Sequence, residues 1–242
     1  MLIALLALIA EYVDSALGMG YGTILSPLLV LLGYDIRQVV PSILATELIT
    51  GLLSGLLHWR AGNTELNKRS MMMLGLLGGV TIVGTSVGAL VMLNLPPLYT
   101  KLYMGLLVSA MGILMLVKRR ARRFSWRGIT SISLLAAFNK AISGGGYGPV
   151  VCSGQILNGI EVKQAIGLTG LAESLTCAIA LVIYALGIGH LDLGLVPALI
   201  IGSVAAVPLA VLTVKHSAPE RLRRVVALGI IVLGLFILKS LI

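Results

Sequence analysis

The sequence has little charge, few aromatic side chains and only two cysteines. Charged residues make up 11% of the 242 positions, against about 25% in an ordinary soluble domain. So few charged groups could not cover the surface of a water-soluble protein of this length. A soluble enzyme, a nucleic-acid-binding domain and a disordered chain are therefore excluded. Hydrophobic residues make up 58%, glycine adds 29 positions and the mean hydropathy is +1.04, which indicates an integral membrane protein.

The other scarcities exclude further classes. Aromatic residues make up 5% of the chain, too few for the aromatic girdles of a porin-type barrel. Cys152 and Cys177 both lie within apolar runs, so a disulfide framework is not expected. The absence of a phosphate-binding loop motif argues against ATP hydrolysis. The three histidines are scattered without metal-ligand spacing, so neither a metal site nor a cofactor is predicted.

Positive charge is absent from the first residues and clustered elsewhere. The segment 1–14 carries Glu11 and Asp14 and no basic residue, which argues against a cleavable signal peptide. The 18 Lys and Arg residues give a formal net charge of +9 and sit mostly in short clusters between apolar runs. This distribution is typical of cytoplasmic loops in membrane proteins, so no nucleic-acid partner is expected.

Apolar stretches of spanning or near-spanning length fill most of the chain. They occupy residues 1–33, 39–58, 70–93, 98–117, 128–158, 164–187, 192–214 and 224–241. The first and fifth are too long for one crossing, and glycine interrupts each near its middle. The interruptions are Gly-Met-Gly-Tyr-Gly at 18–22 and Gly-Gly-Gly-Tyr-Gly at 144–148.

These two interruptions indicate an internal repeat. A shift of 126 positions superposes the two Gly-Tyr-Gly segments, and it also pairs Gly33 with Gly159, Asp35 with Glu161, Arg37 with Lys163, Gln38 with Gln164 and Glu47 with Glu173. A collinear set that includes rare charged residues is not expected by chance. We therefore predict a first membrane repeat at 1–118, a basic linker at 119–125 and a second membrane repeat at 126–242.

The positions of Lys and Arg predict how the halves lie, because cytoplasmic loops are enriched in both. If each glycine-broken stretch is a re-entrant hairpin, each half crosses three times and the halves are inverted. One side then receives most of the 18 basic residues, and the other only Arg37, Lys101 and Lys239. Eight full crossings would divide them far more evenly. The expected fold is an all-α integral membrane protein of two inverted repeats, each a Gly-broken re-entrant helical hairpin plus three transmembrane helices.

The same distribution predicts the orientation of the chain. We expect a multi-pass protein of the inner (plasma) membrane, with the basic linker in the cytoplasm and both termini outside.

The broken segments are candidate binding sites. An unwound backbone leaves amide groups without partners in lipid, so it survives only inside protein or beside a water-filled cavity. Paired broken helices in inverted repeats are typical of secondary transporters. Helix N-termini after the breaks, near Thr23 and Pro149, would present N–H groups and a positive dipole end to an anion. The predicted substrate-binding residues are Gly20, Tyr21, Gly22, Thr23, Ser26, Lys140, Gly145, Gly146, Tyr147, Gly148 and Cys152.

Other interpretations of these residues stay open. The glycines could serve only close helix packing, as we expect for the glycine pairs at 51/55, 75/79 and 84/88. Tyr21 and Tyr147 could donate hydrogen bonds to an oxyanion or simply anchor the breaks. Ser26 and Cys152 follow the two breaks at equivalent positions, and the Cys152 thiol could face a ligand or react with a sulfur substrate.

Two pairs of ionisable residues lie within apolar stretches, where a charge is costly and usually faces a cavity or a partner. Glu47 and Glu173 are matched by the repeat and fall near mid-membrane. We predict proton coupling for them, with charge compensation or a neutral hydrogen-bonded role as alternatives. Asp14 and Lys140 each lie four residues before equivalent glycines of the breaks. They form either a salt bridge between the hairpins or, through Lys140, the positive charge that attracts the anion.

The glycine breaks also carry a family resemblance. The segments ALGMGYGTILSP at 16–27 and SGGGYGP at 143–149 resemble the TauE/SafE family of sulfite and organosulfonate exporters, and the resemblance covers essentially the whole chain. It implies a transporter of sulfite, sulfonates or related small sulfur-containing anions.

The function predicted from these patterns is a secondary transporter. It would export the anion by alternating access around a central site formed by the two breaks, coupled to the proton gradient. The alternatives are an anion channel or uniporter for another small oxyanion or carboxylate, and a membrane enzyme of sulfur metabolism using Cys152. The chain lacks a plausible acid, base and nucleophile set, so no enzyme is expected. The expected partners are the anion, protons, the lipid bilayer and, through the small-residue faces, a second copy in a homodimer.

Overall fold

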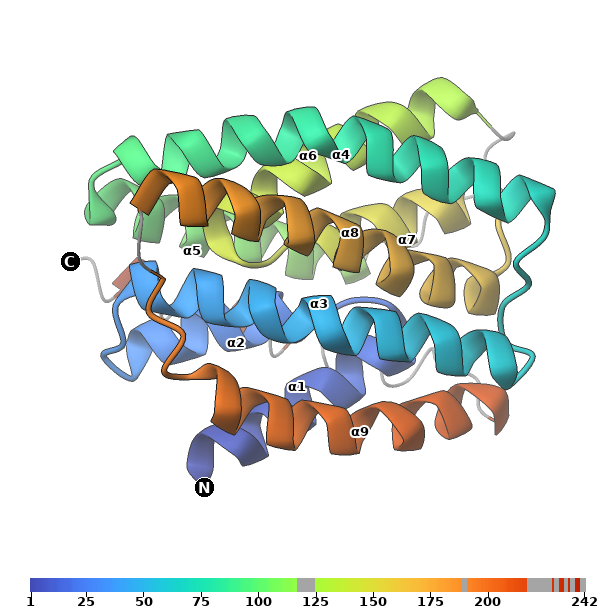
Figure 1. Cartoon of the computed structure of the whole chain (residues 1–242), viewed down its shortest axis with the longest axis horizontal. Helices are drawn as coiled ribbons and strands as arrows, with labels where there is room; N and C mark the ends of the chain where they lie inside the picture. Colours follow the sequence, from blue (N-terminus) through green and yellow to red (C-terminus); the bar gives the residue numbers. More distant parts are fainter. Residues whose placement is uncertain are drawn as a thin grey trace.

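The computed structural model describes residues 1–116, 125–188, 191–216, 228, 231–232, 235 and 238–239. The longer regular elements among these residues are all helices (Figure 1): α1 (Leu2–Leu17), α2 (Tyr21–Leu31), α3 (Ile36–Arg60), α4 (Lys68–Asn94), α5 (Pro97–Leu116), α6 (Trp126–Ser143), α7 (Tyr147–Leu157), α8 (Val162–Ile188) and α9 (Val196–His216). The protein is therefore all-α, as predicted. Residues 119–124 of the predicted linker and much of the last apolar stretch lie outside the described residues.

Four helices, α3, α4, α8 and α9, are long and apolar enough to cross a membrane. α3 has 25 residues and α4 has 27, and at 1.5 Å per residue each is longer than the hydrocarbon core of about 30 Å. In Figure 1 all four run along the long axis of the molecule. That axis is therefore the direction in which the chain crosses the bilayer.

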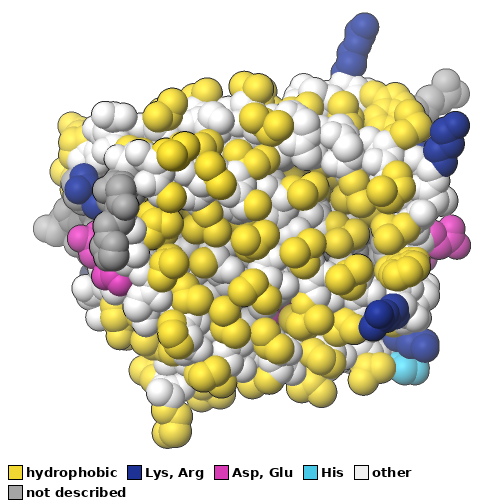
Figure 2. Space-filling model, viewed as in Figure 1, with side chains coloured by type: hydrophobic (Ala, Val, Ile, Leu, Met, Phe, Trp, Pro, Cys, Tyr) yellow, Lys and Arg dark blue, Asp and Glu magenta, His cyan; other side chains and the backbone are white. Residues whose placement is uncertain are grey.

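The surface has the character expected of a protein immersed in lipid. Figure 2 shows apolar side chains over most of the visible face and charged side chains toward its two ends. Exposed large side chains on the spanning helices include Val83, Leu90, Val182, Ile201 and Leu209. An apolar surface of this extent is unfavourable in water and is solvated by hydrocarbon chains in a bilayer. The molecule is an integral membrane protein.

The helix pairs α1–α2 and α6–α7 are hairpins broken by glycine. α2 and α7 have 11 residues each, about half of what a bilayer requires. Each pair turns back inside the molecule, among the long helices (Figure 1). α2 begins at Tyr21 and α7 at Tyr147, and α3 and α8 begin at Ile36 and Val162, so these starts recur at the predicted shift of 126. The inverted relation of the two halves stays a prediction.

Basic residues gather at one end of the molecule. α3 and α9 end there, and α4 and α8 begin there (Figure 1). This end carries Arg60, Lys68, Arg69, Lys163 and Lys215, and we call it the basic end. The Lys163 ammonium donates to the backbone carbonyl of Lys215 at 3.2 Å, which ties α8 to α9. The cytoplasmic location of this end stays a prediction.

Glycine lets α4 approach α6 closely. A Cβ on Gly84 would lie 2.5 Å from the carbonyl oxygen of Leu134, and one on Gly88 would lie 2.5 Å from that of Phe138. Neither distance is tolerated without movement of the backbone. The 84/88 pair therefore packs helices closely, as predicted.

Gly75 and Gly79 behave differently from the 84/88 pair. An added Cβ at either position meets no atom of the described part of the chain within 4 Å. The expectation that they serve close packing is therefore wrong for the contacts within this chain, because both face away from the neighbouring helices.

This difference predicts opposite outcomes for two identical substitutions on one helix. Gly88→Ala is expected to destabilise the protein by about 1–3 kcal/mol, because the new methyl group forces α4 and α6 apart. Gly75→Ala is expected to leave stability unchanged or slightly raised, because alanine has the higher helix propensity. Thermal unfolding of the purified variants in detergent measures both. Equal unfolding temperatures for the two variants would contradict the close α4–α6 crossing.

Candidate functional site

Four glycines shape the two breaks, because each takes a backbone conformation that other residues rarely adopt. Gly18 ends α1 with φ 67°, and Gly144 ends α6 with φ 70°. Gly20 and Gly146 precede α2 and α7 with φ 142° and φ 80°. Glycine enters this region without a Cβ clash. The helices therefore break where the glycine runs predict.

The two breaks lie against one another, backbone to backbone. A Cβ on Gly22 would overlap the carbonyl oxygen of Gly144. A Cβ on Gly145 would lie 2.7 Å from the carbonyl group of Gly22, and one on Gly148 would lie 2.7 Å from the Gly18 carbonyl oxygen. Even one methyl group at these positions would push the hairpins apart. Three of the predicted site glycines, Gly22, Gly145 and Gly148, are thus brought together at the contact between the hairpins.

Ser26 and Cys152 each hold the opposite break. The Ser26 hydroxyl donates to the Ser143 carbonyl at 2.6 Å, and the Cys152 thiol donates to the Leu17 carbonyl at 3.5 Å. The two donors are 126 residues apart, and so are the two acceptors. In this conformation both side chains join the hairpins.

A charged cluster lies beside the breaks. It consists of Asp14 on α1, Glu47 on α3, Lys140 on α6 and Glu173 on α8, and we call it the central cluster. The Lys140 ammonium donates to Glu47 Oε2, and to Glu173 Oε1 at 2.8 Å. Lys140 is fully buried, and both glutamates are buried as well. The predicted pair of glutamates therefore meets at a single lysine.

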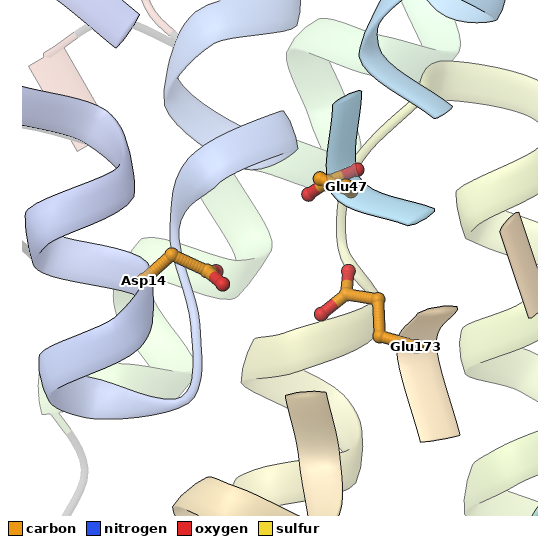
Figure 3. A group of neighbouring side chains, drawn as sticks. All are labelled: Asp14, Glu47 and Glu173. Carbon is orange, nitrogen blue, oxygen red and sulfur yellow. The ribbon is translucent and has the colours of Figure 1, made fainter. Parts of the chain in front are cut away.

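Asp14 completes the cluster without pairing directly with Lys140. Carboxylate oxygens of Asp14, Glu47 and Glu173 lie within 4.8 Å of one another, and Figure 3 shows the three groups turned toward a shared space. The expected Asp14–Lys140 salt bridge is replaced by the two glutamate pairs. One Asp14 oxygen instead accepts from the Tyr21 backbone N–H at 3.1 Å, at the start of α2.

The first amides of α2 already have carboxylate acceptors. Besides the Tyr21 amide, the Gly22 N–H donates to Glu47 Oε1 at 3.2 Å. The helix N-terminus that was predicted to attract an anion therefore holds two carboxylates of the protein itself. An external anion would have to take their place.

The two tyrosines of the breaks differ in their partners. The Ser203 hydroxyl donates to the Tyr21 hydroxyl at 3.1 Å. The Tyr147 hydroxyl is buried and makes no hydrogen bond to the residues that the structure describes. Thr23 joins the second break, where its hydroxyl accepts from the Gly146 N–H at 3.0 Å.

The cluster holds more negative than positive groups in an apolar interior. Three carboxyl groups face one ammonium, and such a group is stable only if every charge has a partner or is neutralised. Three chemical roles fit this arrangement. The carboxyl groups can bind protons, their oxygens can hold a cation, and Lys140 can exchange a carboxylate for an anion.

Sequence reasoning missed two of these residues. Asp14 was not expected to join the glutamates, although its match to Lys140 in the repeat was a visible signal. Ser203 as the partner of Tyr21 had no signal in the sequence, because α2 and α9 are far apart in the chain.

The fold and the site define a multi-pass membrane protein with a buried, charged centre between two broken helix hairpins. The family model described as "Sulfite exporter TauE/SafE" matches residues 3–237, and the chain belongs to this family. The chain is similar to "Probable membrane transporter protein YtnM" of Bacillus subtilis (strain 168), at 24% identity over 250 residues that cover 98% of this chain and 80% of the relative. No solved structure matches it significantly. The protein is a membrane transporter.

The ion pairs of the central cluster predict a large effect of removing Lys140. Lys140→Met is expected to destabilise the protein by about 3–5 kcal/mol, because it leaves buried carboxylates without a partner. Combining it with Glu47→Gln and Glu173→Gln is expected to restore much of that loss. Thermal unfolding in detergent compares the single and the triple variant. A triple variant less stable than the single one would show that the pairs do not carry the stability of this region.

Proposed function

We propose that this transporter carries a small sulfur-containing anion, sulfite or an organosulfonate, by alternating access, with protons bound at the central cluster. The proposal is supported by the family, which is described as sulfite exporters. It rests above all on Lys140, the only Lys or Arg that is buried among the described residues, and on its two glutamate partners.

An anion can reach Lys140 only in competition with Glu47 and Glu173. Protonation of either glutamate removes its negative charge and weakens its hold on the ammonium, which frees Lys140 to bind an oxyanion. The anion and the proton therefore bind together. When the anion leaves, the glutamate regains the lysine and releases its proton.

The N-terminus of α2, beside the central cluster, also contributes to recognition of the anion. The amides of Tyr21 and Gly22 donate to Asp14 and Glu47, so the exchange that frees Lys140 can also free an amide. Amides at a helix N-terminus and one ammonium suit a compact anion with several acceptor oxygens. Sulfite and sulfonate groups each offer three such oxygens.

The direction of transport follows from the gradients. By the positive-inside rule we expect the basic end in the cytoplasm of the inner (plasma) membrane and both termini outside. A carrier that binds anion and proton together is reversible. Export results when the outward gradient of the anion exceeds the inward gradient of protons.

Anion flux into proteoliposomes with and without a pH gradient tests the coupling. An inward proton gradient of one pH unit, about 1.4 kcal/mol per proton, is expected to drive about tenfold accumulation for each proton carried. Sulfite is the first substrate, and an alkanesulfonate, which stays ionised throughout, is the second. The double variant Glu47→Gln/Glu173→Gln is expected to lose the accumulation.

Glu11→Gln is a matched control, because Glu11 is also a buried carboxyl but bonds to Ser15 rather than to Lys140. It is expected to keep the gradient dependence. Downhill flux that ignores pH would contradict proton coupling and favour a uniporter or channel. Absence of flux for both substrates, with folded protein, would contradict the sulfur anion.

A further inference from the structure

A polar pocket opens at the basic end of the molecule. It lies between the α3–α4 loop, the start of α4 and the start of α8, and its volume is about 290 Å³. Its polar walls include Asn67, Arg69, Ser70, Glu161, Lys163 and Gln164. Met73 and Leu168 also line it and belong to the apolar core beneath. The pocket has room for several water molecules or a small hydrated anion.

A narrow gap lies one helical turn deeper along α4. Leu77, four residues after Met73, lines it together with residues of α6 and α7, among them Ser133, Val151 and Gln155. The gap does not admit a water-sized sphere in this conformation. The pocket and the gap therefore lie in line on one face of α4, separated by packed apolar side chains.

Gln155, one of the residues that line this gap, has a buried polar atom without a partner among the described residues. Its side chain is 1% exposed, and its Nε2 donates to the Thr169 hydroxyl at 2.9 Å, while its Oε1 accepts no hydrogen bond from the residues that the structure describes. An unsatisfied buried acceptor of this kind costs about 1–3 kcal/mol. Water or a ligand that entered the gap would remove this cost.

A second unpaired group continues the same line toward the central cluster. Tyr147, Val151 and Gln155 recur every four residues and so share one face of α7. Tyr147 begins α7 directly after the break, and its buried hydroxyl also makes no hydrogen bond to the described residues. The face of α7 therefore carries unpaired polar atoms at both ends of an apolar segment.

The matching positions of the first half have no such features. Gln155 and Thr169 correspond to Leu29 and Ile43, which are both fully buried. Tyr21, which corresponds to Tyr147, has a hydroxyl partner. In these matched pairs, Gln155 and Tyr147 each keep a polar atom without a partner among the described residues, whereas Leu29 and Tyr21 do not.

We infer that the pocket is the mouth of an access route from the basic end to the central cluster, lined by Gln155 and Tyr147 and closed in this conformation by the apolar side chains between them. Its occupant during transport is the small hydrated oxyanion that the transporter carries. The inference rests on the proposed function for the identity of this anion, but not for the existence of the route. Opening requires α4 to move away from the α6–α7 hairpin, which admits water to the two unpaired groups.

Cysteine labelling in membrane vesicles tests the route without measuring transport. In a background of Cys152→Ser and Cys177→Ala, Gln155→Cys is treated with the membrane-impermeant anion 2-sulfonatoethyl methanethiosulfonate. The reagent is added to vesicles of either orientation. Asn67→Cys, at the rim of the pocket, identifies the orientation that exposes the basic end. We expect Gln155→Cys to react from that side and not from the other.

Leu29→Cys is the matched control, because it occupies the same helix position in the first half. Gln155→Cys is expected to react about tenfold faster or more, equivalent to roughly 1.4 kcal/mol in the free energy of access. Ser133→Cys, a conservative change in the wall of the same gap, is the second probe, with Ala7→Cys as its counterpart in the first half. If Gln155→Cys does not fold, the labelling of Ser133→Cys tests the access route in its place.

Each outcome bears on one of the two proposals. Reaction of Asn67→Cys alone, with both gap cysteines inert, would overturn the route. Equal reaction of a gap cysteine and its counterpart would overturn the asymmetry between the halves. If an alkanesulfonate slows the labelling, the route and the anion are both supported. If the labelling proceeds from the basic end and an alkanesulfonate does not slow it, the route is supported. The sulfonate is then overturned as the occupant of the route.

Discussion

The ammonium group of Lys140, held between Glu47 and Glu173 in the interior of an apolar molecule, is the interaction on which the rest of the structure depends. A buried charge is tolerated only with partners at hydrogen-bond distance. Three helices, α3, α6 and α8, therefore have to converge at one point. The positions of the long helices follow from this requirement as much as from the packing of their apolar faces.

The broken hairpins make that convergence possible. Lys140 lies in the last turn of α6, just before the break at Gly144, so the break falls beside the two glutamates. The breaks in turn expose amides that need acceptors. Asp14 and Glu47 supply two of them at the start of α2, so the carboxyl groups that balance the lysine also stabilise the break. The buried charges and the break therefore share two of the same carboxyl groups.

Much of this architecture could be predicted from the sequence, because it follows from local patterns. Glycine runs locate the breaks, and apolar length locates the spanning helices. The depth of Glu47 and Glu173 follows from counting residues along a helix. The partners of these residues could not be predicted in the same way. Lys140 was matched with Asp14 by the repeat, but the choice between Asp14 and the glutamates depends on how α6 packs against α3 and α8.

The side-chain contacts between the hairpins could not be predicted from the sequence for the same reason. Ser26 and Cys152 stand where a ligand could be expected, and in the folded chain each bonds a carbonyl of the opposite break. A repeat in the sequence indicates which positions are equivalent, but not which of them meet. That information appears only when the two halves are placed face to face.

The two halves share their breaks and differ in the side chains that surround them. Around the first break the matching positions are apolar and packed, as at Leu29 and Ile43, whereas around the second they are polar, as at Gln155 and Thr169. A carrier cannot open both ends at once without dissipating its gradient. In the proposed cycle, unequal packing at the two ends would make the opening of one end cost less free energy than the opening of the other. In the proposed alternating-access cycle, these side chains would contribute to the free-energy difference between the two states without touching the charges of the central cluster.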